Sequence, residues 1–166
     1  MKKLKYCSTC GNKNSFGNKD GATRYYCNQC GDIHYENPKP TATLICPRSE
    51  EILLVKRAFS PAKGLWGLPG GFIELNETPE DGAMRELKEE TNLNGKVVKL
   101  LGHCSHFNSV FGDILLLGIE MEIENWEALK AGDDAADVGF FNYKECPPLA
   151  FQCHQKILEM FIKTKI

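Results

Sequence analysis

The chain has 166 residues, 42% of them hydrophobic and 25% charged, and a formal net charge of -2 at pH 7. This composition is typical of a globular protein, and the length suffices for one hydrophobic core and a small additional module. No apolar run approaches the roughly 20 residues of a membrane-spanning helix, and the N-terminus lacks the apolar stretch of a signal peptide, so we expect a cytoplasmic protein without a membrane partner.

The first 37 residues contain two pairs of cysteines, and a glycine follows each pair. Cys7 and Cys10 form the first pair, and Cys27 and Cys30 form the second. Two C-x-x-C pairs at this separation are typical of a structural zinc site with four thiolate ligands, the alternatives being a redox pair or unrelated cysteines. A segment this small has no core of its own, so zinc would supply much of its folding free energy. We predict a zinc ribbon over residues 1–37, with these four cysteines as the metal ligands.

The charge of the chain is unevenly distributed. Residues 1–40 carry seven Lys or Arg against three Asp or Glu, whereas the rest of the chain is acidic. A basic ribbon can bind nucleic acid. The basic residues here are scattered lysines without arginine clusters, and ribbons also serve in protein docking or dimerisation. The sequence therefore favours a ribbon without a nucleic-acid partner.

Two prolines stiffen residues 37–40, and we place the domain boundary there, with a second domain over residues 38–166. Apolar segments rich in Val, Ile, Leu and Phe predict two β-hairpins in this domain. The predicted hairpins join residues 41–46 to 51–57 and residues 96–107 to 111–123. Lys56 and Arg57 end one of these strands, where an exposed strand end is a more ordinary role than contact with an anionic substrate.

A strand over residues 138–141 and an amphipathic helix over residues 150–163 are predicted to close the domain. Cys153 and His154 lie on this last helix. Neither has a partner nearby in the sequence, so we interpret both as packing or surface residues.

An acidic helix is predicted over residues 78–91, directly after the glycine pair Gly70 and Gly71. Pro79 suits the first helical position, and acidic residues follow it at the positive end of the helix dipole. The glycines indicate a sharp turn or a close approach of the backbone to another group.

Glu86, Glu89 and Glu90 stand at i, i+3 and i+4 of this helix and share one face. Their carboxylates repel one another, and a hard divalent cation such as Mg²⁺ or Mn²⁺ would remove that repulsion. A face with three glutamates is more often an ordinary solvated surface. The glycine loop that leads into the helix favours a phosphate and metal site instead.

The chain resembles the Nudix hydrolases at the positions of that family's signature, the Nudix box: Gly71, Glu77, Arg85, Glu86, Leu87, Glu89, Glu90 and Leu93. It departs from the family pattern at Asn92, where the family has glycine. Asparagine is the next most tolerant residue after glycine of the left-handed conformation that ends a helix. We therefore expect the departure to leave the chemistry intact.

The resemblance implies an α+β fold, the Nudix α/β/α sandwich, behind the small N-terminal zinc ribbon. It also implies metal-dependent catalysis, with Mg²⁺ or Mn²⁺ held by Glu86, Glu89, Glu90 and the carbonyl of Gly70. The general base is left unassigned among the box glutamates and acidic residues outside the box.

Further site residues follow from the same resemblance. An acidic residue before the strand at 138–141 should complete the metal site, and we choose Asp134, with Asp137 in reserve. The plain alternative is that Asp133 and Asp134 only form a turn. Arg85 is expected to hold Glu77 and to orient the helix.

A Nudix domain behind a zinc ribbon is similar to NADH pyrophosphatases and to related enzymes acting on FAD or ADP-ribose. Residues 101–112 lack the Ser-Gln-Pro-Trp-Pro-Phe-Pro-like run of the NADH enzymes. This absence weakens the case for NADH as the substrate without excluding other dinucleotide diphosphates. We expect hydrolysis at the diphosphate of such a small-molecule nucleotide, with release of a nucleoside monophosphate. Gly70, Gly71 and Phe107 are the predicted substrate contacts.

Alternatives remain open at this point. His103, His106 and Phe111 join Phe107 as candidates for a base pocket, although aromatic residues in strands are as often part of the core. Hydrolysis of nucleoside triphosphates or of RNA caps needs only a different base pocket. A non-catalytic ligand- or nucleic-acid-binding module would normally have lost its carboxylates. A homodimer is expected from the resemblance alone.

Overall fold

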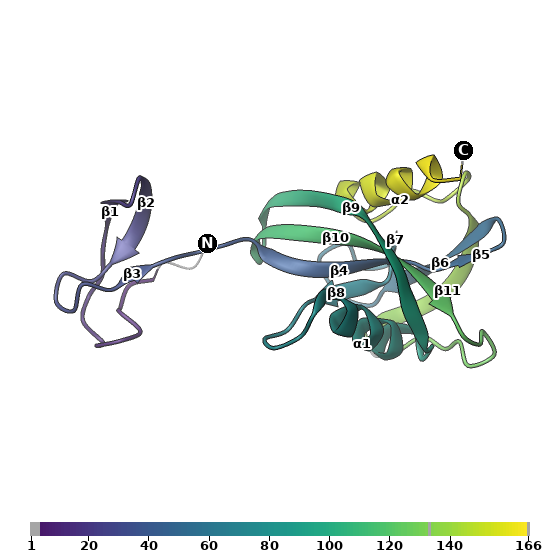
Figure 1. Cartoon of the computed structure of the whole chain (residues 1–166), viewed down its shortest axis with the longest axis horizontal. Coiled ribbons are helices and arrows are strands. Elements are labelled where there is room, and N and C mark those ends of the chain that lie inside the picture. The colour runs from purple at the N-terminus through teal and green to yellow at the C-terminus, as the bar shows by residue number, and fades with distance from the viewer. Residues whose placement is uncertain (1–3, 133, 166) are drawn as a thin grey trace.

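The computed structural model describes residues 4–132 and 134–165, so Asp133 of the predicted turn lies outside the described residues. Figure 1 shows a small N-terminal part joined by an extended segment to a larger part. The small part is the ribbon, an antiparallel sheet with the order β1 (Ser15–Lys19), β2 (Ala22–Tyr26) and β3 (Ile33–His34). After the extended segment, β4 (Lys39–Ile45) begins the larger part.

Two β-sheets form the centre of the larger part, within the residues that the structure describes. In the first, β4 and β10 are parallel and the other neighbours are antiparallel. Its strands lie in the order β8 (Gly70–Phe72), β4, β10 (Gly112–Ile123) and β9 (Gly95–Ser109). The second sheet has the order β11 (Ala135–Asn142), β6 (Glu51–Arg57) and β5 (Pro47–Arg48), and β6 also pairs with β7 (Trp66–Gly67).

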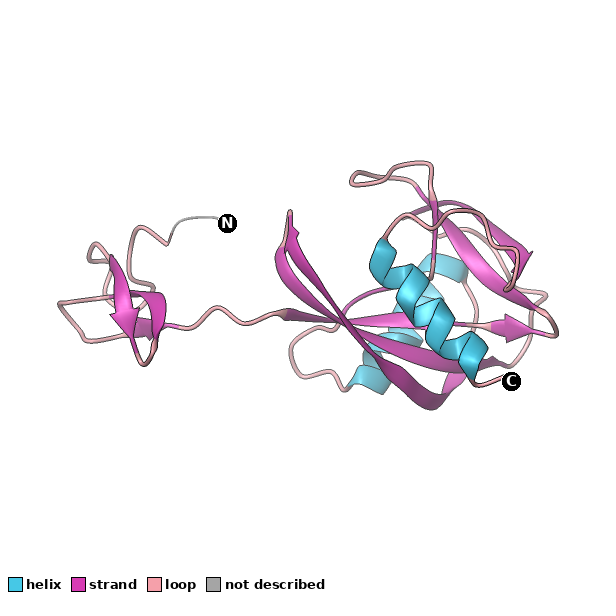
Figure 2. Ribbon diagram, turned by 90° about the horizontal axis from the view of Figure 1, so that it is seen from above, coloured by secondary structure: helices cyan, strands magenta, loops and turns pink. Residues whose placement is uncertain are grey.

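The helices α1 (Pro79–Thr91) and α2 (Gln152–Lys163) lie on opposite sides of these sheets (Figures 1 and 2). Each helix buries an apolar face in its own core cluster: Ala83 and Leu87 on α1, and Ile157, Leu158 and Phe161 on α2. The predicted α+β fold, with helices on both sides of the strands, is therefore confirmed. No helix among the described residues is long and apolar enough to span a membrane.

The first predicted hairpin is only partly correct. β4 pairs with β8 and β10 in one sheet, whereas β6 pairs with β5, β7 and β11 in the other. The hairpin that does form joins β5 to β6, and the amide of Leu53 donates to the carbonyl of Cys46 just before β5. The chain thus changes sheets at this turn, and β4 pairs along its whole length with β10 instead of with β6. The second predicted hairpin is confirmed as β9 and β10.

The predicted acidic helix is confirmed as α1, and its ends explain why it forms. Thr78 caps the N-terminus in a reciprocal capping box with Asp81, and Pro79 occupies the first helical position. Asn92 caps the C-terminus in the left-handed conformation, with φ 58°. Its side-chain amide also donates to the carbonyl of Ala128 over 2.9 Å. The asparagine at the divergent position thus ends the helix as glycine would.

We predict that Asn92→Ala lowers the free energy of unfolding by about 1–2 kcal/mol, because alanine is strained at this φ and loses the bond to Ala128. Asn92→Gly is the matched control, since glycine loses the same bond without the strain, and it should stay within about 0.5 kcal/mol of the unsubstituted protein. Urea denaturation measures both variants. Equal losses in the two variants would show that the left-handed cap is energetically unimportant.

Candidate functional site

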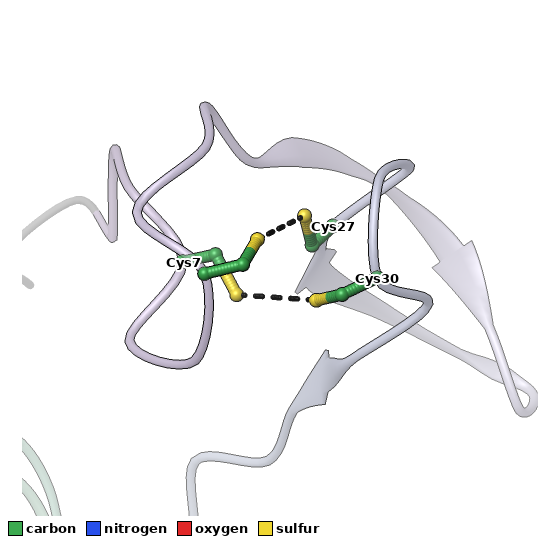
Figure 3. Close-up of side chains that lie close together, drawn as sticks. Cys7, Cys27 and Cys30 are labelled. Carbon is green, nitrogen blue, oxygen red and sulfur yellow. Dashed lines mark hydrogen bonds between the residues drawn. The ribbon is translucent and has the colours of Figure 1, made fainter.

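The four ribbon cysteines converge, and their sulfur atoms all lie within 4.8 Å of one another. The Sγ atoms of Cys7 and Cys30 are 3.7 Å apart, and those of Cys10 and Cys27 are 3.5 Å apart. Figure 3 shows the side chains of Cys7, Cys27 and Cys30 pointing toward one another. Tetrahedral zinc with Zn–S bonds of about 2.3 Å places its sulfur ligands roughly 3.8 Å apart. The geometry and the soft thiolate donors therefore fit a four-cysteine zinc site.

In the larger part, the glycine loop lies directly against the acidic helix. A Cβ atom on Gly70 would overlap the carbonyl oxygen of Ala42 in β4, and one on Gly71 would lie 2.5 Å from Oε1 of Glu86. The amide of Gly70 donates to Oε2 of Glu90 over 2.8 Å. The absence of a side chain at Gly70 thus lets β8 approach β4, and its absence at Gly71 lets the carboxylate of Glu86 approach the backbone of β8.

Burial changes the proton affinity of these two carboxylates. It raises the pKa of Glu90 to about 8, against the opposing effects of the Gly70 amide and Arg57, and the nearby Glu86 adds to the rise. Burial also raises the pKa of Glu86, although Arg85 opposes it. Two acids buried side by side disfavour their own ionisation. A divalent cation would compensate this cost, and the carboxylate donors suit Mg²⁺ or Mn²⁺.

Arg85 links the helix to the loop that precedes it. Its Nε and Nη2 atoms donate to the two carboxylate oxygens of Glu77 over 2.6 and 3.0 Å, and Nη2 also donates to the carbonyl of Phe72 over 2.8 Å. This guanidinium lowers the pKa of Glu77 to about 2. Nη1 donates to Glu86 and Glu89 over 2.8 and 2.9 Å. Arg85 thus contacts the carboxylates and holds the backbone of β8 beside them.

A cavity of about 360 Å³ lies beside these acids. Glu86 and Glu90 line it, and Asp134 lines it from the segment before β11. Glu89 does not line this cavity. Its carboxylate contacts Arg85, and 58% of its side chain is exposed. Asp137 accepts a hydrogen bond from the amide of Val138. We call this space the carboxylate cavity.

A second cavity of about 230 Å³ adjoins the carboxylate cavity, and we call it the apolar cleft. Phe72 and Phe111 line both spaces, with their rings in edge contact and their centroids 5.5 Å apart. His106, one of the candidates for a base pocket, lines the cleft. Phe107, by contrast, is 66% exposed and lines neither cavity. The apolar cleft and the carboxylate cavity thus share a wall beside the glycine loop.

Arg57, Phe151 and His154 are among the lining residues of the cleft that were not selected from the sequence. Arg57 and His154 line both cavities, and Phe151 lines the cleft. The amide of Leu68 donates to Nδ1 of His154 across 86 positions of sequence. No local pattern marks such a contact, because α2 reaches the glycine loop only through the tertiary fold.

Comparisons with known proteins agree with this geometry. The family model described as NUDIX domain matches residues 38–161, and the model described as Nudix N-terminal, a zinc ribbon, matches residues 5–36. An ADP-ribose pyrophosphatase of Methanocaldococcus jannaschii is 39% identical over 132 residues, covering 79% of this chain and 77% of the relative. A NUDIX hydrolase from Nitrosomonas europaea has a crystal structure with a TM-score of 0.85 and 30% identity, covering 98% of this chain and 92% of that one.

The NAD-capped RNA hydrolase NudC of Vibrio parahaemolyticus is similar as well, being 26% identical over 147 residues. The match covers 89% of this chain but 54% of the relative. The chain therefore spans about half the length of this NudC protein.

We predict that Cys27→Ser reduces the zinc content of the purified protein strongly, because a four-thiolate site loses a ligand. The ribbon should then lose its sheet while the larger part keeps its melting transition. Atomic emission measures the metal, and two-dimensional NMR follows the fold. Cys146→Ser, a cysteine outside the ribbon, is the control and should keep one zinc per chain. Full zinc content in Cys27→Ser would contradict the four-cysteine site.

We also predict that Gly71→Ala weakens Mn²⁺ binding about tenfold or more, since the added methyl displaces the carboxylate of Glu86 from the cavity. The free energy of unfolding should change by less than about 1 kcal/mol, because a flexible side chain can move aside. Isothermal titration calorimetry and urea denaturation separate the two effects. Unchanged Mn²⁺ affinity would show that Glu86 is not a ligand.

Proposed function

The chain belongs to the Nudix family of hydrolases, and from this membership we propose that it hydrolyses the diphosphate of a dinucleotide-type substrate, with ADP-ribose as the first candidate. The observation that carries the proposal is the apolar cleft adjoining the carboxylate cavity. A nucleoside placed in the cleft would extend its diphosphate toward Glu86 and Glu90. The pyrophosphatase name of the 39% identical relative supports the same substrate.

Mg²⁺ or Mn²⁺ is the metal that this site would hold, with Glu86, Glu89, Glu90, Asp134 and the carbonyl of Gly70 as its proposed ligands. When bound, the cation supplies positive charge that stabilises the oxygens of the reacting phosphates. Glu86, Glu90 and Asp134 already line the cavity, and Glu89 would join them by leaving Arg85. The proposed ligands thus offer oxygen donors from the helix, the glycine loop and the segment before β11.

The proposed reaction also needs residues that position the carboxylates and a residue that accepts a proton. Arg85 keeps the helix carboxylates in register with the glycine loop through its bonds to Glu77 and Phe72. Water attacks one phosphorus, the bond from that phosphorus to the bridging oxygen breaks, and the leaving phosphate retains the electron pair. The proton of the water passes to a carboxylate of the cavity, for which Glu86, Glu90 and Asp134 are the candidates. The products from ADP-ribose are AMP and ribose 5-phosphate.

The ribbon is proposed to hold a structural Zn²⁺ through its four cysteines. A cytoplasmic location and a homodimer stay predictions from sequence and resemblance. Size-exclusion chromatography with light scattering tests the dimer, and cell fractionation tests the location.

A second candidate function is removal of a dinucleotide cap from RNA, as the names of the NudC relatives suggest. The same diphosphate would be cleaved, and the RNA would have to leave the apolar cleft at its open end. Val110, at the tip of the β9–β10 hairpin, is 77% exposed, so this rim faces solvent. This exposure gives a longer substrate an exit.

The two candidates are separated by incubating the protein and Mg²⁺ or Mn²⁺ with ADP-ribose, NADH, FAD, nucleoside triphosphates and NAD-capped RNA. Mass spectrometry identifies the products. We expect a nucleoside monophosphate from ADP-ribose at the highest kcat/KM. Preferred cleavage of the capped RNA would favour the second candidate, and release of pyrophosphate from triphosphates alone would contradict both.

We predict that Glu90→Gln lowers kcat on the best substrate by about a hundredfold or more. The glutamine amide carries no negative charge, so it binds a divalent cation more weakly and does not accept a proton from water. Glu89→Gln should lower kcat in the same direction. Glu80→Gln, exposed in the first turn of the same helix, is the matched control and should keep kcat within about twofold. Melting temperatures should stay close in all three variants. Near-normal turnover in both Glu89→Gln and Glu90→Gln would refute the assignment.

A further inference from the structure

His154 is held in a fixed orientation on the N-terminal turn of α2. Its Nδ1 atom accepts a hydrogen bond from the amide of Leu68 over 3.0 Å. The ring packs on Gly67, where an added Cβ would lie 3.2 Å from Nδ1 and 3.4 Å from Cε1. A side chain at position 67 would therefore push the imidazole away from its place.

The bond to Leu68 also sets the tautomer. A ring nitrogen that accepts from an amide cannot carry a proton, so the proton of the neutral ring is on Nε2. Burial lowers the pKa of His154 to about 4, and the nearby Arg57 and His106 contribute to the decrease. At neutral pH the side chain is thus an uncharged donor whose Nε2–H direction is fixed.

His154 lies at the place where the two cavities meet. His154 and Arg57 both line the carboxylate cavity and the apolar cleft. Within residues 4–132 and 134–165, Nε2 of His154 has no hydrogen-bond acceptor, whereas Nδ1 has its donor. A polar group at a cavity wall with no protein partner is available to a ligand or to water. The first turn of α2 adds the positive end of its dipole at the same point.

We propose that His154 is a substrate-binding residue whose Nε2–H donates to a phosphate oxygen of the substrate, on the nucleoside side of the diphosphate. The inference rests on the proposed diphosphate hydrolysis and adds to it a named contact outside the Nudix box. A substrate that crosses from the apolar cleft to the carboxylate cavity must pass this donor and the guanidinium of Arg57. His154 acts in binding and orientation, and it transfers no proton in the reaction.

A purely structural role makes a different prediction. The contact with Leu68 joins α2 to the segment that leads into Gly70. A hydrogen bond from the amide of Ala150, just before α2, to the carbonyl of Trp66 in β7 over 2.7 Å makes a second attachment nearby. If His154 served only this attachment, any side chain that accepts from Leu68 would preserve function. The two nitrogens of the ring can be tested separately, because asparagine places an oxygen near Nδ1 and glutamine places a nitrogen near Nε2.

The test compares His154→Asn and His154→Gln in the full chain. His154→Asn keeps the acceptor for Leu68, so its melting temperature should stay close to that of the unsubstituted protein. Its KM for ADP-ribose should rise about tenfold or more through loss of a hydrogen bond to a charged group, while kcat changes less than about threefold. His154→Gln keeps a donor near Nε2, so its KM should lie closer to the unsubstituted value than that of His154→Asn. Its melting temperature should be lower, because it loses the acceptor for Leu68. Binding of a non-hydrolysable α,β-methylene analogue of ADP-ribose, measured by calorimetry, should weaken in parallel with KM.

The outcomes separate this inference from the proposed function. An unsubstituted protein that neither cleaves nor binds any diphosphate of the panel would overturn the proposed function. An active unsubstituted protein with unchanged KM and analogue affinity in His154→Asn would overturn only the role of His154. If His154→Gln loses more affinity than His154→Asn, the attachment to Leu68 is what matters, and the donor role is again wrong.

Discussion

The burial of Glu86 and Glu90 against the backbone of Gly70 and Gly71 is the constraint on which the catalytic domain depends. Two carboxylates in this position disfavour their own ionisation, and the chain partly offsets the cost with the Gly70 amide and the guanidinium of Arg85. The rest of the domain serves to keep this contact in place. The capping box starts the helix at the right residue, and the pairing of β8 with β4 fixes the loop that the helix faces.

Features that depend on local chemistry were predictable from the sequence. The caps of α1, the cysteine pairs and the spacing of the box glutamates all lie within short stretches, where one residue constrains its neighbours. Features that depend on tertiary pairing were not. The separation of β4 from β6 follows from partners that β4 finds more than 70 positions away in β10. His154 lacked a local signal for the same reason. Phe107 was selected from the sequence as a substrate contact, but Phe111 lines the cleft and Phe107 does not.

The larger part and the ribbon differ in what stabilises them. The larger part surrounds its sheets with separate core clusters beneath α1 and α2. The ribbon has a short sheet and exposed aromatic residues, such as Phe16 and Tyr6, so its apolar burial is small. Its four sulfur atoms lie at the spacing of the ligands of a tetrahedral metal ion, and the proposed zinc would replace a core as the source of folding free energy.

The walls of the apolar cleft come from different elements than the carboxylates do. The β9–β10 hairpin supplies Phe111 and His106, whereas α1 supplies the acids, and the glycine loop lies between the two groups. If the cleft binds the nucleoside as proposed, mutations that lengthen or reshape the hairpin would alter which nucleoside is accepted and leave the carboxylates of α1 in place. Substitutions at the exposed tip of the β9–β10 hairpin would then change the substrate in the course of evolution without changing the carboxylates.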